Sequence, residues 1–474
     1  MKANANPKAN HQILILTYGV VLLFIGLAVY YGYFLQVKSD SVINNSYNAR
    51  LDSFADRVVR GEIRSSNGQI LARTDVDGEG HETRVYPYDS VFAHAVGYSV
   101  NGKTGLEAQS NFYLLTSHVN IIEQVINELY SKKNQGDNVV TTLDVDLQKK
   151  AYEALGKRNG AVIVMEPDTG KILAMVSKPD YNPNTILSDW NNLVAEENTS
   201  GQLLNRATQG LYPPGSTFKI VTALEYIREN PDHYKDYVFD CDGIYENGDY
   251  SIKCYHETVH GHQNFTQAFA NSCNGAFSSL GLLMDLNRLR NTSEQLLFNT
   301  DFSLPFPSNR SSYTMAPGAD TWQILQTAIG QGQTQITPIH NAMITAAIAN
   351  GGTLMKPYLI DHVENAGGDI IKKFVPQAYG TIMTAEESAR MTELMRAVVT
   401  DGTGSAVRTD AYTVAGKTGS AEFDKNKETH AWFVGFAPAD HPKIAVSVIV
   451  EEGGAGGKTA APIARSLFDL YFSR

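Results

Sequence analysis

The sequence predicts an α+β protein in which one antiparallel sheet is flanked by helices, preceded by a small α+β pedestal and one transmembrane helix. Three observations predict this arrangement. A long apolar run occupies residues 13–35, apolar strand patterns occur near 161–176 and again at 414–450, and the chain between them has helix and loop patterns. A sheet assembled from both ends of a domain, with helices inserted between its strands, is an α+β arrangement.

The apolar run at residues 13–35 is expected to be a membrane anchor. It contains no charged side chain, and at about 1.5 Å per residue it can cross a hydrocarbon core of about 30 Å. Lys2 and Lys8 precede the run and only Lys38 closely follows it. This bias predicts a cytoplasmic tail at 1–12 and an extracytoplasmic remainder. Because no small-residue cleavage site follows the run, we expect an uncleaved, single-pass protein of the cell membrane.

Residues 36–138 are expected to form the pedestal. A membrane-proximal helix is predicted from residue 36 to about 60, and Asn67-Gly68 between two short apolar runs predicts a β-hairpin. An amphipathic helix is predicted at 118–130. A change of pattern near Val139 then marks the start of the large domain, 139–474.

The large domain has a clear order of predicted elements. The turn signal at 167–170 separates two fully apolar strands, which should be buried on both faces. The other elements are a helix at 146–155, a helix beginning near Ser216, a helix at 343–349, strands at 414–421, 431–436 and 444–450, and a closing helix at 461–472.

Charge and cysteine content restrict the function. The 474 residues carry a formal charge of −11, which argues against a nucleic-acid-binding protein. Cys241 and Cys254 flank a polar loop, so a disulfide and a pair of free buried thiols fit the sequence equally well, and Cys273 is left over. Cys and His residues are not spaced as in common zinc motifs, so no metal and no cofactor are predicted.

Ser216 and Lys219 are the first candidate catalytic pair. They follow Pro213-Pro214-Gly215 at a predicted helix start, three residues apart and therefore on one face. A serine hydroxyl needs a base to become a nucleophile, and a lysine can be that base only when burial or nearby positive charge keeps it neutral. The non-catalytic alternative is a capping serine beside a solvated lysine, since a chain of this length contains roughly one or two Ser-x-x-Lys pairs by chance.

Two further motifs favour catalysis. Ser272-Cys273-Asn274 precedes Lys417-Thr418-Gly419, which lies on a predicted strand. Penicillin-binding proteins and serine β-lactamases carry Ser-x-x-Lys, Ser-Asp-Asn and Lys-Thr-Gly in this order. Cys273 takes the place of the middle aspartate. Taken singly, Ser272 and Asn274 could merely cap a helix.

With these motifs the chain resembles a class B penicillin-binding protein, a monofunctional, membrane-anchored peptidoglycan D,D-transpeptidase. The resemblance covers nearly the whole chain. It implies a serine β-lactamase-like transpeptidase domain and a dimerisation-like pedestal. Further matching motifs are Asn205-Arg206-Ala207-Thr208, Gly330-Gln331-Gly332, Gly402-Thr403-Gly404, Trp432-Phe433-Val434-Gly435 and, in the pedestal, Arg60-Gly61 and Gly105-Leu106-Glu107.

The resemblance also implies a role for each site residue. Ser216 would attack D-Ala-D-Ala with Lys219 as base, and Ser272 would relay a proton. Asn274 would hold the stem peptide. The terminal carboxylate would be bound by Lys417, Thr418 and Ser420, on a strand that Gly419 leaves open to close approach. Backbone N–H groups of Ser216 and Ser420 would form an oxyanion hole.

Partners and rival functions follow from the same resemblance. The expected partners are peptidoglycan stem peptides, β-lactams and a separate multi-spanning glycan polymerase, because the pedestal is too small to hold a polymerase domain of its own. A D,D-carboxypeptidase, a serine β-lactamase and a non-enzymatic cell-wall-binding sensor or scaffold are the alternatives. The lifetime of a penicillin adduct would separate a transpeptidase from the β-lactamase and from the scaffold.

Overall fold

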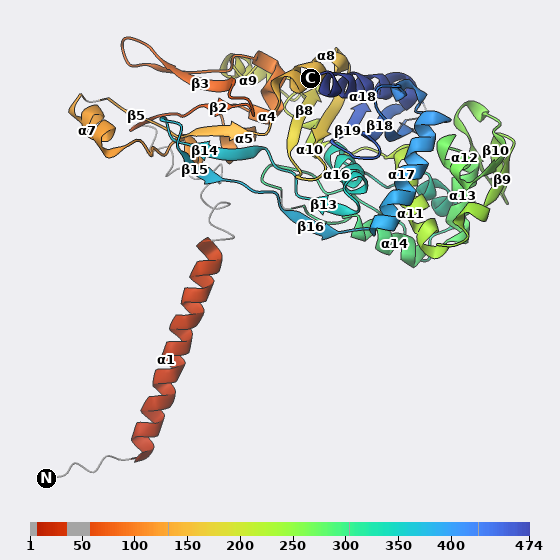
Figure 1. Ribbon diagram of the computed structural model, residues 1–474, viewed down its shortest axis with the longest axis horizontal. Helices are drawn as coiled ribbons and strands as arrows, with labels where there is room; N and C mark the ends of the chain where they lie inside the picture. The colour runs from red at the N-terminus through yellow and green to blue at the C-terminus, as the bar shows by residue number, and fades with distance from the viewer. Residues whose placement is uncertain (1–6, 36–56, 131, 303, 425) are drawn as a thin grey trace.

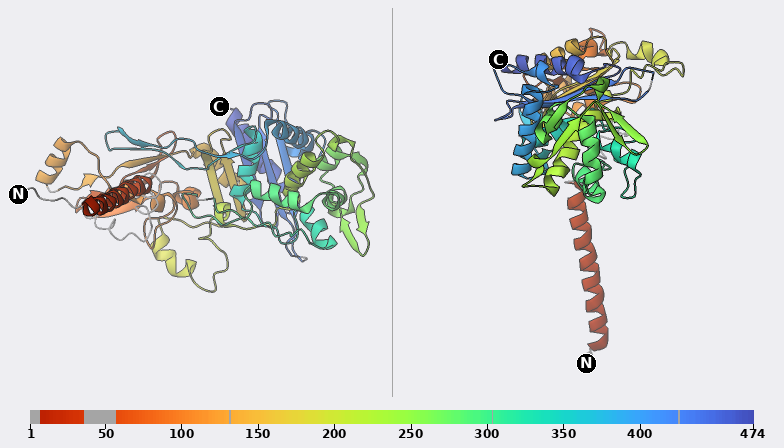
Figure 2. Two further views of the ribbon diagram at one scale, coloured as in Figure 1. Left: turned by 90° about the horizontal axis from the view of Figure 1, so that it is seen from below. Right: turned by 90° about the vertical axis from the view of Figure 1, so that its right-hand side faces the viewer.

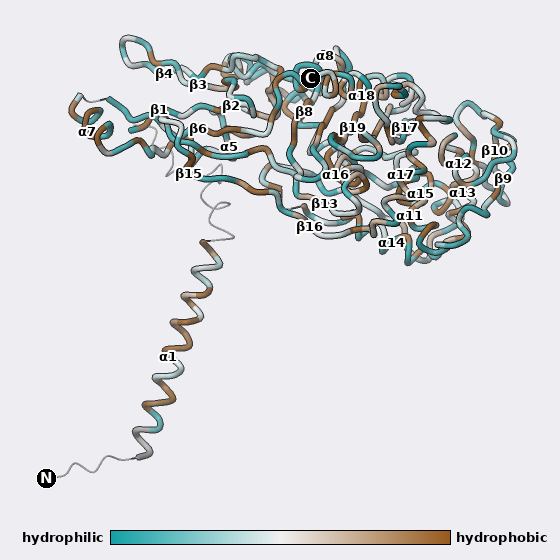
Figure 3. The backbone as a smooth tube through the Cα atoms, viewed as in Figure 1, coloured by the Kyte–Doolittle hydropathy of each residue, from teal (hydrophilic) through white to brown (hydrophobic). Residues whose placement is uncertain are grey.

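The computed structural model describes residues 7–35, 57–130, 132–302, 304–424 and 426–474 (Figure 1). Beyond the N-terminal helix, a pedestal and a large domain lie end to end, as two further directions of view also show (Figure 2). A tube coloured by hydropathy shows apolar residues along most of the N-terminal helix, beyond its first turns, and in the interior of the large domain (Figure 3).

Helix α1 (Pro7–Tyr33) corresponds to the expected membrane anchor. Among the described residues, only His11–Tyr33 is a helix long and apolar enough to cross a membrane. This fits the anchor predicted at 13–35, whereas its orientation stays a prediction. The helix expected from 36 to about 60 falls mostly outside the described residues, and its last part forms the short strand β1 (Val58–Val59).

The pedestal is built on a six-stranded sheet. Its hairpin β2–β3 turns at Gly68, whose φ of +81° suits glycine at an Asn-Gly turn, as the sequence predicts. The predicted amphipathic helix is α7 (Ile121–Leu129). The strand order is β15 (Ile370–Lys373), β14 (Ile360–Glu364), β6 (Asn138–Thr141), β2 (Ile63–Arg64), β3 (Ile70–Val76) and β4 (Glu82–Val85).

Two strands of the pedestal sheet come from far along the chain. The hairpin β14–β15 lies inside the range 139–474 that the sequence assigns to the large domain, yet Val363 of β14 pairs with Val139 of β6. Strand β6 stands at the predicted boundary and pairs with β14 on one side and β2 on the other. The two parts therefore share a sheet and are not joined by a simple linker.

The large domain has one five-stranded antiparallel sheet made from both ends of its sequence, as predicted. The strand order is β17 (Ala415–Ala421), β18 (His430–Ala437), β19 (Ile444–Val450), β7 (Gly160–Met165) and β8 (Ile172–Lys178). All residues of β7, β18 and β19 are buried, as fully apolar strands require. Strand β17 is an edge strand, so one side of it is available to other groups.

Helices cover both faces of this sheet. Helices α8 (Val145–Leu155) and α18 (Gly456–Phe472) pack with Val162 and Val446 in one apolar cluster. Helix α16 (Pro338–Ala349) packs with alternate strand residues, such as Ile163, in a second cluster. Because neighbouring strand residues point to opposite faces, the two clusters lie on opposite sides of the sheet.

The insertion between β8 and β17 forms a helical lobe. Its main helices are α11 (Lys219–Glu229), α12 (Phe265–Ala270), α13 (Asn274–Leu283), α14 (Leu286–Gln295), α15 (Thr321–Ala328) and α17 (Ala385–Thr400). Two small sheets lie at the end farthest from the pedestal (Figure 1): β9 (Val238–Cys241) with β12 (Gly261–Asn264), and β10 (Ile244–Asn247) with β11 (Tyr250–Lys253).

Short elements complete the described chain. They are η2 (Asp89–Phe92), α4 (Ala93–Val96), α5 (Gly105–Gln109), α6 (Asn111–Leu114), β5 (Asn134–Gln135), α9 (Ile186–Leu193), α10 (Arg206–Gln209), η3 (Gly215–Phe218), η4 (Tyr234–Asp236), η5 (Tyr255–Glu257), β13 (Thr353–Met355), β16 (Ala378–Thr381) and η6 (Ser405–Val407).

Candidate active site

Ser216 lies in a tight turn that leads into α11. The sequence predicts an α-helix start here, but residues Gly215–Phe218 form the 3-10 turn η3 and Lys219 is the first residue of α11. The reason is Gly215, whose φ of +52° reverses the chain before the helix. Ser216 is partly exposed, and among the described residues its hydroxyl makes no hydrogen bond, so it is available to a substrate.

Neighbouring loops fix the turn. The N–H of Gly215 donates to the carbonyl of Gly330 at 2.9 Å, and the indole of Trp432 donates to the carbonyl of Pro213 at 3.1 Å. A Cβ on Gly330 would lie 2.1 Å from the carbonyl oxygen of Gly215, which is too close for any side chain. The glycine at position 330 is therefore required for this contact.

Lys219 is fully buried and aims its amine at the Ser272 motif. Its Nζ donates to the Ser272 carbonyl and to Asn274 Oδ1, both at 2.7 Å, and it lies 3.3 Å from the Ser272 hydroxyl. Burial, which disfavours the charged form, lowers the pKa of Lys219 to about 8. With this pKa about a tenth of Lys219 is neutral at pH 7, which is far more than for an ordinary lysine, and a general base must be in this neutral form.

The Ser272 hydroxyl lies between two buried amines. Lys417 Nζ donates to it at 2.9 Å, and also to the carbonyl of Thr418 at 3.0 Å. Burial and the charge of Lys219 hold the pKa of Lys417 well below its ordinary value. Ser272 has a left-handed φ of +56° in the short link between α12 and α13. Such strain in a non-glycine residue is concentrated at functional sites.

The predicted substrate-binding residues lie along β17. Gly419 faces the η3 turn, since a Cβ there would lie 3.2 Å from Thr217 Cγ2 and 3.3 Å from the carbonyl of Pro214. The Thr418 hydroxyl bonds to that of Thr403 at 2.6 Å, and the Ser420 hydroxyl accepts from the N–H of Gly456 at 3.4 Å. A Cβ on Gly215 would lie 2.8 Å from the carbonyl of Ser420, so turn and strand are in contact at both ends.

The structure therefore brings together the residues that the sequence selects. Ser272 and Asn274 contact Lys219 directly, Ser272 contacts Lys417, and Gly419 and Ser420 lie against the Ser216 turn. Thr403 is the middle residue of the Gly402-Thr403-Gly404 motif, to which the sequence assigns no role. Its contact with Thr418 joins two loops far apart in the chain, and no local pattern shows such a contact.

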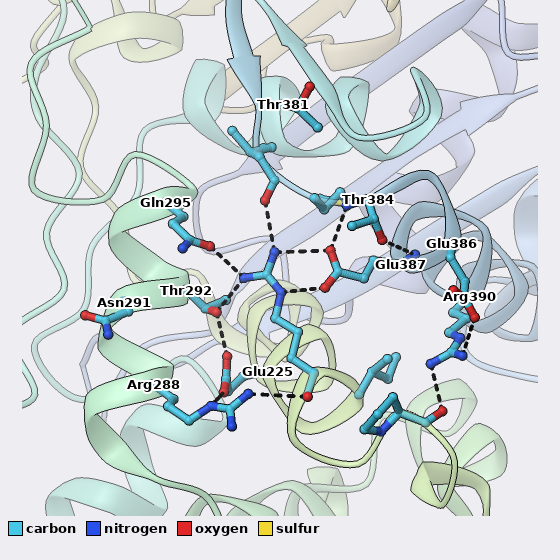
Figure 4. A pocket seen from close by; sticks show the side chains of 15 residues that line it. Glu225, Arg288, Asn291, Thr292, Gln295, Thr381, Thr384, Glu386, Glu387 and Arg390 are labelled. Atoms are coloured by element: carbon cyan, nitrogen blue, oxygen red, sulfur yellow. Dashed lines mark hydrogen bonds and ion pairs between the residues drawn. The ribbon is translucent and has the colours of Figure 1, made fainter.

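A hollow of about 810 Å³ beside the C-terminal part of α11 is a different feature (Figure 4). Arg228 crosses it and donates to Glu387, Thr292, Gln295 and the carbonyl of Ile382. A guanidinium with four partners is a structural crosslink between α11, α14 and α17. The residues that line the hollow do not include Ser216 or the other residues of the motifs.

Comparisons with known proteins agree with this geometry. The family model of the penicillin binding protein transpeptidase domain matches residues 160–469, and that of the penicillin binding protein A dimerisation domain matches 60–139. The peptidoglycan D,D-transpeptidase PbpA of Mycolicibacterium smegmatis is 33% identical over 86% of this chain and 88% of its own length. The D,D-transpeptidase MrdA of Acinetobacter baumannii is 29% identical over 83% of this chain and 66% of its own length.

Solved structures show the same similarity. The ceftriaxone acyl-enzyme complex of penicillin-binding protein A from Mycobacterium tuberculosis superimposes with a TM-score of 0.79 at 30% identity, covering 88% of this chain and 99% of that one. A D,D-transpeptidase domain from Eggerthella lenta gives the same TM-score and coverage at 31% identity. The first of these structures holds a β-lactam as an acyl-enzyme.

Proposed function

Because the chain belongs to the penicillin-binding protein transpeptidase family, we propose that it cross-links peptidoglycan stem peptides through an acyl-enzyme on Ser216. The observation that carries the proposal is the shared Ser272 hydroxyl, hydrogen-bonded both to Lys417 and to Lys219, which follows the Ser216 turn as the first residue of α11. A pair of buried amines around one hydroxyl is an arrangement for moving protons.

Acylation begins with attack of Ser216 Oγ on the carbonyl carbon of the penultimate D-Ala. Neutral Lys219 takes the hydroxyl proton, and the backbone N–H groups of Ser216 and Ser420 hold the oxyanion. The C–N bond then breaks. The leaving D-Ala amine receives a proton through Ser272, which lies between the two lysines. In a β-lactam the same attack opens the ring, and the leaving nitrogen stays tethered.

Deacylation repeats these steps in reverse with a second stem peptide. The acceptor amine attacks the ester carbonyl, gives a proton to Lys219, and displaces Ser216 Oγ, which recovers its proton. Asn274 is held in one orientation, because Lys219 Nζ donates to its amide oxygen and the carbonyl of Lys253 accepts from its amide nitrogen at 2.8 Å. The second N–H of this amide remains for a hydrogen bond to the peptide backbone of the substrate.

Substrate binding also influences which of the two lysines, Lys219 or Lys417, is protonated. Two ammonium groups beside one hydroxyl repel each other, so the free enzyme favours a state in which at least one lysine is neutral. The terminal carboxylate of a substrate adds a negative charge near Lys417, Thr418 and Ser420 and favours the charged form of Lys417. A charged Lys417 then favours neutral Lys219, which is the form that the attack requires.

The test is the lifetime of a fluorescent-penicillin adduct on the purified full-length protein. A transpeptidase forms a stoichiometric adduct that persists for many minutes, and Ser216→Ala forms none. Rapid turnover with product release would instead identify a β-lactamase. A folded wild-type protein that forms no adduct would identify a non-enzymatic scaffold. Adding stem-peptide acceptors of increasing concentration separates transfer from the hydrolysis that a carboxypeptidase performs.

The wider setting of the protein belongs to the same proposal. Residues 36–138, joined by the hairpin β14–β15, act as pedestal and the rest of 139–474 as catalytic domain, with the tail 1–12 in the cytoplasm and the catalytic domain outside. A separate multi-spanning glycan polymerase supplies the strands to be cross-linked. Purified protein mixed with lipid-linked disaccharide-peptide should therefore make no glycan chains until a polymerase is added; chains made by the protein alone would contradict this.

A further inference from the structure

Three cysteines and one histidine meet beside the active site. The Sγ atoms of Cys241, Cys254 and Cys273 and a ring nitrogen of His260 all lie within 4.8 Å of one another. The three cysteines are buried and His260 is partly buried. The sequence suggested either a disulfide or two free thiols, with Cys273 left over; the structure has three free thiols in one cluster with a histidine.

The spacing of these atoms fits the ligands of one tetrahedral metal ion. The sulfur of Cys254 lies 3.7 Å from that of Cys241 and 3.8 Å from that of Cys273. The Nδ1 atom of His260 lies 3.3 Å from Cys241 Sγ. Tetrahedral zinc with Zn–S bonds of about 2.3 Å and Zn–N bonds of about 2.0 Å separates its sulfurs by ~3.8 Å and sulfur from nitrogen by ~3.5 Å.

We propose that Cys241, Cys254, His260 and Cys273 bind one structural zinc ion. Three soft sulfur ligands and one imidazole in a tetrahedron are the donor set that zinc prefers. On binding, the three thiols lose their protons and His260 binds as neutral imidazole, so the filled site carries a net charge of −1. With four protein ligands the site is closed, which makes the ion structural and not catalytic.

The local backbone is suited to a metal–thiolate centre. The N–H of Ala276 donates to Cys273 Sγ at 3.4 Å at the start of α13. Hydrogen bonds of this kind stabilise the negative charge of metal-bound thiolates and orient the ligands.

The ion would join segments that have little apolar core of their own. Cys241 ends β9, Cys254 follows β11, His260 precedes β12, and Cys273 caps α13. The two small sheets expose apolar residues, with Val238 55% and Tyr250 40% exposed. A metal ion that joins four chain positions would therefore stabilise the two small sheets, whose own apolar packing is limited.

The same ion would position two residues of the active site. Cys273 lies between Ser272 and Asn274, both of which bond to Lys219, and Lys253, whose carbonyl accepts from Asn274, directly precedes Cys254. A shift of either cysteine moves its neighbours. This positioning role rests on the proposed function, whereas binding of the metal does not.

Metal content of the full-length protein, purified in detergent without chelators or reductants, tests the site. Inductively coupled plasma mass spectrometry should find about one zinc per chain. Cys254→Ser and His260→Ala should each lower this content at least fivefold. His262→Ala is the matched control, because His262 lies two residues away, is exposed and contacts Asp240 through Nδ1 at 2.8 Å; this variant should retain the zinc.

The wild-type measurement needs no variant to fold and can overturn the proposal by itself. Less than about a tenth of a zinc per chain, iron in place of zinc, or a Cys241–Cys254 disulfide in non-reduced peptides would each overturn it. Removal of zinc with a chelator, followed by the rate of fluorescent-penicillin acylation, tests the positioning role. We expect a loss of at least tenfold that added zinc reverses; an unchanged rate would overturn that role and leave both the metal site and the proposed function standing.

Discussion

At the residue scale, the site depends on two lysines that share one serine hydroxyl. Ser272 Oγ lies 3.3 Å from Lys219 Nζ and 2.9 Å from Lys417 Nζ, and both lysines are buried. Desolvation lowers the pKa of each, and Lys417 is lowered further by the charge of Lys219. The consequence is that a lysine, usually a fixed cation, can accept a proton here.

Acylation should therefore depend on pH through Lys219. Its pKa is lowered to about 8, so below that pH the amine is protonated and cannot act as a base, and the penicillin acylation rate should rise with pH and level off above about pH 9. Lys219→Arg keeps the charge but cannot deprotonate, so its rate should fall by at least tenfold at pH 8 and show no such rise. A wild-type rate that is flat between about pH 6 and 9 would contradict this assignment.

At this scale the sequence predicts which residues belong to the active site, but it predicts few of the contacts between them. Ser216, Lys219 and Lys417 stand out because their motifs are local. The link between Thr403 and Thr418 and the cluster of Cys241, Cys254, His260 and Cys273 depend on long-range packing. The four residues proposed as metal ligands lack the closely spaced Cys-x-x-Cys or His-x-x-x-His pairs by which zinc motifs are recognised in sequence.

At the element scale, the nucleophile is held by glycine contacts between a turn, a loop and an edge strand. The N–H of Gly215 in η3 donates to the carbonyl of Gly330 in a neighbouring loop, and Gly419 of β17 lies against the same turn. Sequence analysis predicts the strands and most helices because their apolar patterns are strong. It misplaces the helix start at Ser216, because the positive φ of Gly215 results from this tertiary contact.

Substitution of Gly330 should disturb the nucleophile from a distance. Gly330→Ala places a Cβ 2.1 Å from the Gly215 carbonyl oxygen, so we expect acylation to slow by at least tenfold, or about 1.4 kcal/mol. Gly332→Ala is the matched control. It has the same φ of +76°, hence the same backbone strain, but the nearest atom to its Cβ is 3.7 Å away. Equal acylation rates in the two variants, measured with fluorescent penicillin, would contradict the steric argument.

At the scale of the whole molecule, the pedestal is held by a buried ion-pair network. Glu107 is completely buried and accepts from Arg60 Nε and from Arg84 Nε, both at 2.7 Å. Burial alone would raise the pKa of Glu107, but Arg60 and Arg84 together hold it below its usual value. In the sequence Arg60 and Glu107 belong to two separate motifs, and the ion pair between them is seen only in the fold.

Removing the charge of Glu107 should destabilise the pedestal strongly. Glu107→Gln leaves two buried guanidinium groups without a counter-ion, a change that costs about 3–5 kcal/mol. The first thermal unfolding transition of the detergent-solubilised protein should move to lower temperature. Glu128→Gln, at an exposed position of α7, is the control and should leave this transition in place. Equal transition temperatures for the two variants would show that the network is not needed for stability.

The sequence also predicts the two-part architecture but not how the parts are joined. Apolar alternation identifies strands, whereas strand partners depend on the whole fold. The pairing of β14 with β6, which carries residues 360–364 into the pedestal sheet, has no local signal.

The central claim is that Ser216 is the nucleophile, and mapping the acylated residue tests it most directly. Trypsin should release residues 207–219 of the penicillin-treated protein as one peptide that contains Thr208, Tyr212, Ser216 and Thr217 as alternative hydroxyls. Tandem mass spectrometry should place one penicilloyl group per chain on Ser216. A stoichiometric adduct on Thr217, on Ser272 or on any other residue would contradict the account.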